Sequence, residues 1–168
     1  MYWVMSAIPD NDDGPVGRRL PSVRGSALSG QRVHVPEDLT GTPVVLLVAY
    51  ERTAEDDLQH WLEFLNFAAP GLRVYTVPTV PPPAYGLLPG AIDDGSRGGI
   101  PRVLWPYVVT VYDPNGSPLR EFLGEGDVDC SLVVLLDRGG VVRWFDAQGF
   151  TVVRGAELLD TLGALEEA

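Results

Sequence analysis

The sequence predicts an α/β fold, in which a largely buried sheet carries helices on its surface. Residues 132–136 form an unbroken apolar run, which is typical of a strand covered on both faces. Residues 137–140 then supply turn chemistry, Asp-Arg-Gly-Gly, and lead into a second strand. A third observation is the change after residue 53 from a strand-like apolar run to a helical spacing of apolar residues.

The length and composition favour a single domain with its own core. The chain has 168 residues, and no apolar run approaches the eighteen needed to cross a bilayer. We expect residues 1–16 to be a flexible or edge-strand lead-in and 17–168 to form the domain. The apolar start from Met1 lacks a basic flank, so we expect no secretory signal and a cytoplasmic location.

The charged and sulfur-bearing residues exclude several classes of function. The net charge of −11 disfavours binding to nucleic acid or to a membrane surface. All twelve basic residues are arginines, which excludes Schiff-base lysines and a P-loop. With Cys130 as the one cysteine and only two histidines, neither an intrachain disulfide nor a Cys/His zinc site can form. We therefore predict no cofactor and no metal.

Two strands and a helix are predicted in the first half of the chain. Residues 32–35 alternate so that His34 faces away from two valines, and 44–48 read as a buried strand. Helical spacing over 53–68 places one apolar stripe on a helix; its members are Leu58, Trp61, Leu62 and Leu65. Thr53 is the expected N-cap with Asp56 at N3, and His60 is expected on the surface.

Residues 78–106 are predicted to be a proline- and glycine-rich insertion. They follow a strand over 72–77, parallel to the one at 44–48, and hold seven of the fifteen prolines. Because the two strands are parallel, the insertion leaves the same sheet edge as Glu51, Arg52 and Thr53. It either shields apolar surface or binds something; its aromatic residues Tyr85 and Trp105, and the following Tyr107, are either packing anchors or ligand contacts.

The remainder of the chain completes the sheet and adds a last helix. We expect a strand over 108–112, a short helix over 119–123, and Trp144 rather than Arg143 facing the core of the hairpin. Residues 150–153 read as strand-like, and a final helix is expected from about Gly155.

Five short motifs occur in an order that resembles the thioredoxin-like superfamily, in particular the peroxiredoxins and the bacterial cytochrome-maturation thioredoxins. They are G-x-x-L-P at 17–21, L-S-G-Q-R-V-H-V at 28–35, D-L-T-G-T-P-V-V-L-L-V at 38–48, V-Y-D-P-N-G at 111–116 and L-L-D-R-G-G-V-V-R-W at 135–144. Two segments, A-Y-E-R-T-A-E-D-D-L-Q-H-W at 49–61 and D-R-G-G-V-V-R-W at 137–144, together also look like the thioredoxin-like assembly factor of mitochondrial ATP synthase. The resemblance implies a three-layer α/β/α sandwich with a mixed central sheet and an N-terminal β-hairpin extension.

The resemblance also implies where active-site residues would stand, and this chain departs from the pattern there. Catalytic members carry a reactive cysteine where the first parallel strand gives way to its helix; Thr53 occupies that place, and Asp56 is about where a resolving cysteine would be. Ser131 stands at the usual cis-proline position, with Cys130 before it. Cys130 is expected near Thr53, with Asp127 and Asp129 raising its pKa.

Three functions remain open from the sequence. The first is a non-redox binding or assembly module that takes a protein partner at this edge through Glu51, Arg52, Thr53, Asp56, Ser131, Tyr85 and Trp105. The second is a monothiol oxidoreductase, a peroxidase or a thiol–disulfide exchange enzyme, that uses Cys130. Thr53 is the other candidate catalytic residue, but a threonine nucleophile needs an adjacent base and the sequence offers none nearby. The third is a small-molecule carrier with a pocket roofed by the insertion.

Overall fold

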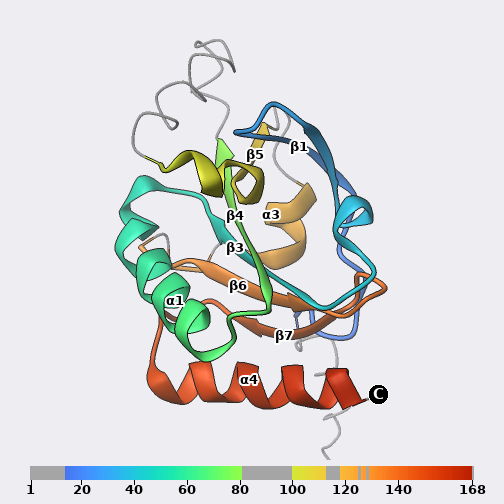
Figure 1. The fold of residues 1–168 in the computed structure, drawn as a ribbon, viewed down its shortest axis with the longest axis vertical. Helices are drawn as coiled ribbons and strands as arrows, with labels where there is room; N and C mark the ends of the chain where they lie inside the picture. Colours follow the sequence, from blue (N-terminus) through green and yellow to red (C-terminus); the bar gives the residue numbers. More distant parts are fainter. Residues whose placement is uncertain (1–13, 81–99, 113–117, 125, 128, 168) are drawn as a thin grey trace, which may run out of the picture.

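The fold was analysed in a computed structural model that describes residues 14–80, 100–112, 118–124, 126–127 and 129–167. Its helices, 3₁₀ turns (η) and strands are placed in Figure 1. In chain order they are β1 Val23–Ala27, β2 Arg32–Val35, η2 Glu37–Leu39, β3 Val44–Ala49, η3 Arg52–Ala54, α1 Glu55–Ala68, β4 Arg73–Val80, η5 Arg102–Tyr107, β5 Val109–Tyr112, α3 Pro118–Leu123, β6 Leu132–Leu136, β7 Val142–Asp146 and α4 Val152–Glu167.

Seven strands form one mixed sheet in the order β2-β1-β5-β4-β3-β6-β7. β3 pairs in parallel with β4, with Val48 opposite Val77, which confirms the predicted parallel pair. On its other side β3 pairs antiparallel with β6, which continues through the Asp137 turn into β7. β1 and β2 make an antiparallel hairpin at the far edge, as the resemblance implies.

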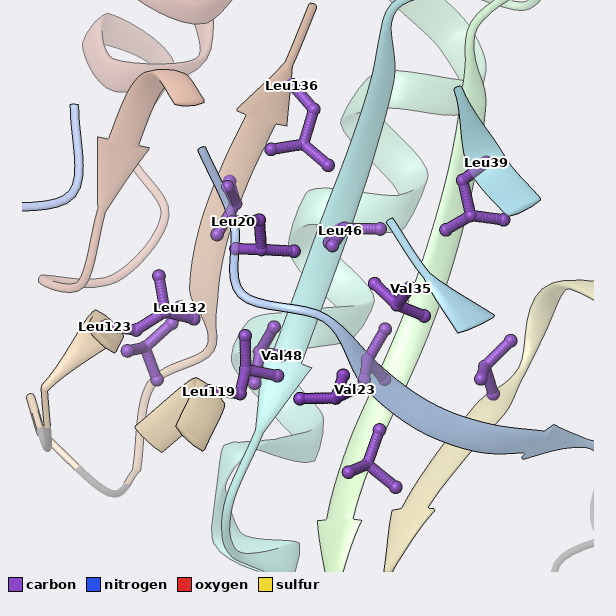
Figure 2. Close-up of a cluster of buried hydrophobic side chains, with 14 of the residues drawn as sticks. Leu20, Val23, Val35, Leu39, Leu46, Val48, Leu119, Leu123, Leu132 and Leu136 are labelled. Atoms are coloured by element: carbon purple, nitrogen blue, oxygen red, sulfur yellow. The ribbon is translucent and has the colours of Figure 1, made fainter. Parts of the chain in front are cut away.

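Both faces of the central strands are covered, which explains why their sequences are apolar without alternation. Val45 and Leu47 of β3 pack with α1 and α4 on one face. Leu46 and Val48 pack on the opposite face with α3 and the β1–β2 hairpin, and Figure 2 shows this second cluster. The sheet therefore has α1 and α4 on one face, and on the other face the short helix α3 together with side chains of the β1–β2 hairpin, which belongs to the edge of the same sheet.

Helix α1 uses the predicted apolar stripe. Leu58, Trp61 and Leu65 are buried against the sheet and α4. The Trp61 ring meets Phe150 edge-on at 5.0 Å and Trp144 at 5.9 Å between centroids. Such aromatic pairs add about 0.5–1.5 kcal/mol each beyond their buried area.

The β6–β7 hairpin is stabilised by the side chain of Asp137. One carboxylate oxygen, Oδ1, accepts hydrogen bonds from the backbone N–H of Gly139 at 2.9 Å and Val141 at 3.0 Å. The other accepts from Nε of Arg143 at 2.8 Å. Trp144 faces the core and Arg143 is exposed, as predicted.

Two predictions about helix starts were wrong. Thr53 is not the N-cap residue of α1, because the helix begins at Glu55 and its N-cap is Ala54. Residues 150–153 are not a strand. Oγ1 of Thr151 accepts a hydrogen bond from the N–H of Arg154 at 3.1 Å, and α4 begins at Val152 because this cap outweighs the β-preference of two valines.

The predicted insertion is described only at its two ends. β4 extends to Val80, and η5 forms at the far end, while Tyr85 lies outside the described residues. The strand predicted over 108–112 is β5, and the helix predicted over 119–123 is α3. In the part of the chain that the structure describes, no helix is long and apolar enough to cross a membrane.

Candidate functional site

The candidate site lies at the sheet edge where β3 passes into α1. Thr53 is in η3, the 3₁₀ turn that immediately precedes α1. β6 runs antiparallel to β3 with Leu132 opposite Val48. Ser131, just before β6, therefore lies at the same edge as the segment that follows β3.

Asp57, in the first turn of α1, connects three segments at this edge. Its Oδ2 accepts hydrogen bonds from the backbone N–H of Ser131 at 2.9 Å and from the Ser131 hydroxyl at 2.8 Å. Its Oδ1 accepts from the backbone N–H of Phe150 at 2.7 Å. One half-buried carboxylate thus joins α1 to the start of β6 and to the segment before α4.

The sulfur of Cys130 lies in the same junction. A Cβ added to Gly149 would be 3.2 Å from Sγ of Cys130 and 3.6 Å from Oδ1 of Asp57. Gly149 has φ +98°, a conformation that side chains rarely adopt, so glycine is needed here both for the backbone and for the space beside the sulfur. The structure therefore places Cys130 against Gly149 and Asp57.

The environment of Cys130 disfavours its thiolate. Burial of the thiol raises its pKa above the ordinary value of 9.0, and the carboxylates of Asp57, Asp127, Asp129 and Asp146 raise it further. The predicted effect of Asp127 and Asp129 is confirmed. At neutral pH Cys130 is a protonated thiol, the form that is neither a nucleophile nor a metal ligand.

The residues predicted for this site fall into two groups. The exposed group surrounds the start of α1 and consists of Glu51, Arg52, Thr53 and Asp56. Ser131, in contrast, is 0% exposed and its hydroxyl is bonded to Asp57. The predicted Asp56 points into solvent, and its neighbour Asp57 is the carboxylate that enters the junction.

Trp105 lies in η5 rather than in the junction. Its indole N–H donates to the carbonyl of Ile100 at 2.9 Å, and Arg102 stacks over its ring at 5.2 Å. Figure 1 shows η5 and the beginning of α1 at the same end of the molecule. Trp105 therefore holds the η5 backbone in place at that end.

Comparison with known proteins gives no match by sequence and a clear match by structure. No protein-family model matches the chain, and no curated protein matches its sequence. The exposed lipoprotein thioredoxin Etrx1 of Streptococcus pneumoniae is 16% identical, with 86% of this chain and 99% of that chain covered and a TM-score of 0.57. Yeast Sco1 is 13% identical, with 84% and 92% covered and a TM-score of 0.58.

A third match is BsSco, a member of the Sco family of cytochrome c oxidase assembly proteins. It is 12% identical, with 90% of this chain and 95% of that chain covered and a TM-score of 0.61. The chain has a thioredoxin-like fold. This confirms the fold that the five motifs imply.

This thioredoxin-like chain has no CxxC pair, because its one cysteine is Cys130. Cys130 lies before β6 and not at the helix start, where Thr53 stands. Asp57, Gly149 and Phe150 were missed by sequence reasoning. Asp57 is 74 positions from Ser131 and 93 positions from Phe150, so local sequence patterns do not indicate these bonds. Gly149 and Phe150 stand just before or within the segment that the sequence wrongly predicted to be a strand.

A hollow of about 550 Å³ lies elsewhere in the thioredoxin-like fold. It is lined by residues of β2, η2, β4 and η5, namely Gln31, Arg32, Val33, Asp38, Leu39, Tyr75, Pro106 and Tyr107. Tyr75 packs with the cluster that contains Leu46, on the sheet face opposite α1. The hollow is therefore separate from the Asp57 junction.

Proposed function

We propose that the chain is a binding or assembly module that has the thioredoxin-like framework without its dithiol chemistry. The single observation that carries the proposal is the carboxylate of Asp57, whose three accepted hydrogen bonds hold the edge together where related enzymes perform thiol chemistry. A carboxylate with these bonds serves structure, and thiol–disulfide exchange needs a thiolate.

The cysteine content supports the same proposal. A disulfide switch has been identified in BsSco, and an intrachain switch needs two cysteines. This chain has one, and burial and four carboxylates raise its pKa. Exchange with an external thiol would start from a protonated, half-buried group.

The surface beside the junction offers polar and apolar groups to a protein partner. Glu51, Arg52 and Asp56 are exposed at the start of α1. Val152 and Val153, which begin α4 two residues after Phe150, are 70% and 67% exposed. An apolar pair with a polar rim is the usual composition of a docking site.

The redox part of the proposal is tested by turnover. Purified protein is assayed for reduction of a protein disulfide with excess dithiothreitol and for consumption of hydrogen peroxide, beside its Cys130→Ser variant. We expect equal, background rates for both proteins. A rate that falls on Cys130→Ser would refute the proposal and establish the monothiol oxidoreductase instead.

The binding part is tested by proximity crosslinking with two matched variants. Val153→Asp changes the apolar pair beside the junction, and Phe67→Asp places the same charge on a side chain that is 90% exposed at the other end of α1. Neither residue is buried, so both variants should fold. We expect a specific crosslinked partner to be lost with Val153→Asp and kept with Phe67→Asp; equal crosslinking of both variants and the parent contradicts the proposed surface.

A second candidate, a small-molecule carrier, is favoured by one observation, the hollow between β2 and η5. Its volume of about 550 Å³ lies within the range of about 300–1,000 Å³ typical of ligand sites. Pro106, the last residue of the predicted insertion, and Tyr107, which follows it, both line this hollow. The two candidates are compatible, because the hollow and the Asp57 junction are on different faces.

A further inference from the structure

We propose that the hollow lined by β2, η2, β4 and η5 binds a small aromatic carboxylate, with the rings against Tyr75 and Tyr107 and the carboxylate at Arg32. This proposal rests on the second candidate function, the small-molecule carrier, and names the class of its ligand; it does not depend on the proposed docking function. The inference combines the apolar floor, the aromatic wall and a set of polar groups that have no partner among the described residues.

The floor and wall of the hollow suit a flat apolar ligand. Val33 and Leu39, which are 9% and 3% exposed, form buried apolar surface at its base. The rings of Tyr75 and Tyr107 lie 5.4 Å apart at 48°, and Pro106 adds a rigid apolar side. Aromatic rings stack on such walls and bury large apolar area at small entropic cost.

The polar groups of the hollow are available for a ligand. Among the described residues, no hydrogen bond or ion pair engages the guanidinium of Arg32, the amide of Gln31, or the hydroxyls of Tyr75 and Tyr107. All four groups can donate hydrogen bonds. Several donors around one hollow favour a ligand that combines acceptor oxygens with apolar surface.

Arg32 is the cation among the described residues that line the hollow, and Asp38 is the anion. Oδ2 of Asp38 accepts a hydrogen bond from the backbone N–H of His34 at 2.7 Å and lies 3.6 Å from Nδ1 of the His34 ring, whereas no ion pair engages Arg32 among the described residues. The guanidinium of Arg32 is therefore the group that is open to a ligand, and a guanidinium binds a carboxylate in a two-pronged geometry. The acidic edge at α1 would repel the same ligand, so the hollow is the favoured place for it.

The test is an NMR titration of the full chain with 2-naphthoate and with its neutral isostere 2-naphthamide. We expect 2-naphthoate to shift the backbone signals of Arg32, Leu39, Tyr75 and Tyr107 and to bind about tenfold more tightly than the amide, as one charged hydrogen-bonded pair predicts. Signals of Cys130 and Ser131, across the sheet, should stay in place.

Two arginine variants separate the charge from the fold. Arg32→Gln removes the cation from the hollow. Arg24→Gln makes the same change on the neighbouring strand β1, where Arg24 lies opposite His34 of β2 and is not one of the residues that line the hollow. Both side chains are exposed, so both variants should fold. We expect Arg32→Gln to abolish the tenfold preference and Arg24→Gln to keep it.

A third variant tests the wall. Tyr107 is 42% exposed, so Tyr107→Ala should fold, and it is expected to weaken both probes by a similar factor. The proposal is overturned by any of three results: no shifts at millimolar 2-naphthoate, equal affinity for the acid and the amide, or shifts centred on the Asp57 junction. None of these results bears on the redox assay of Cys130, so the two proposals fail separately.

Discussion

The substitution Asp57→Ala tests the central feature of the site. It leaves the backbone N–H groups of Ser131 and Phe150 without their acceptor. An unpaired buried donor costs about 1–3 kcal/mol. The cost of the unpaired Ser131 N–H should fall in the upper part of that range, because Ser131 is 0% exposed. The cost at Phe150 should fall in the lower part, because Phe150 is half-buried and water can reach its N–H. We expect a total loss of about 3 kcal/mol in the free energy of unfolding.

The matched control is Asp56→Ala, because Asp56 is exposed in the same first turn of α1. Both variants lose one negative charge at the positive end of the helix, so this effect cancels in their difference. Urea unfolding followed by circular dichroism measures both variants, and the midpoints are compared at equal slope. A difference below about 1 kcal/mol, within the scatter of ordinary surface substitutions, refutes the structural role of Asp57.

Three further predictions concern Cys130, Asp137 and the glycines of α4. Alkylation of Cys130 by iodoacetamide should have a pH–rate midpoint above 9.0; a midpoint below that value contradicts the burial and carboxylates described here. Burial tends to raise the pKa of Asp137, but the hydrogen bonds that its carboxylate accepts within the hairpin prevail and lower the pKa from 3.8. The ionised carboxylate therefore stabilises the fold above pH 3.8, and this contribution is lost as the pH falls through the lowered pKa of the folded state. The stabilities of the parent and of Asp137→Asn, measured by urea unfolding, should converge at acid pH. Gly155→Ala should destabilise the protein by about 1–3 kcal/mol, because the added Cβ would lie 2.6 Å from the Phe64 ring. Gly163→Ala has open space around the added Cβ and should stabilise the protein by about 0.5–1 kcal/mol through helix propensity. Thermal unfolding in which both variants change stability in the same direction would contradict this packing.

Local patterns predicted the fold well because its main elements are covered on both faces or amphipathic. The runs at β3 and β6 admit few other structures, and the stripe that contains Leu58, Trp61 and Leu65 could only be a helix. The hairpin turn at Asp137 is also local, since its bonds reach no further than Arg143.

Local patterns failed where a side-chain bond decides between two structures. Val152 and Val153 are β-branched, so the sequence pattern favours a strand. In the structure the Thr151 cap begins a helix instead, and both valine side chains are exposed on it. Likewise, Thr53 has the chemistry of an N-cap, yet η3 precedes α1 and shifts the helix start to Glu55. Neighbouring residues can each serve as the N-cap, and the choice shifts the start of the helix by one or two positions. The spacing of apolar residues does not locate a helix start that closely.

The role of Asp57 could not be read from its neighbours, since three carboxylates follow one another at positions 55–57 and only the fold distinguishes them. The first-turn position directs Asp57, and not Asp56, toward the segments before β6 and α4. A cis-proline at position 131 would lack the N–H that Asp57 accepts, so the serine and the aspartate fit each other as a pair. That pair uses the buried inner side of the edge, so the partner surface that we propose uses the side chains left exposed at the starts of α1 and α4, and the ligand site that we propose is the hollow on the opposite face.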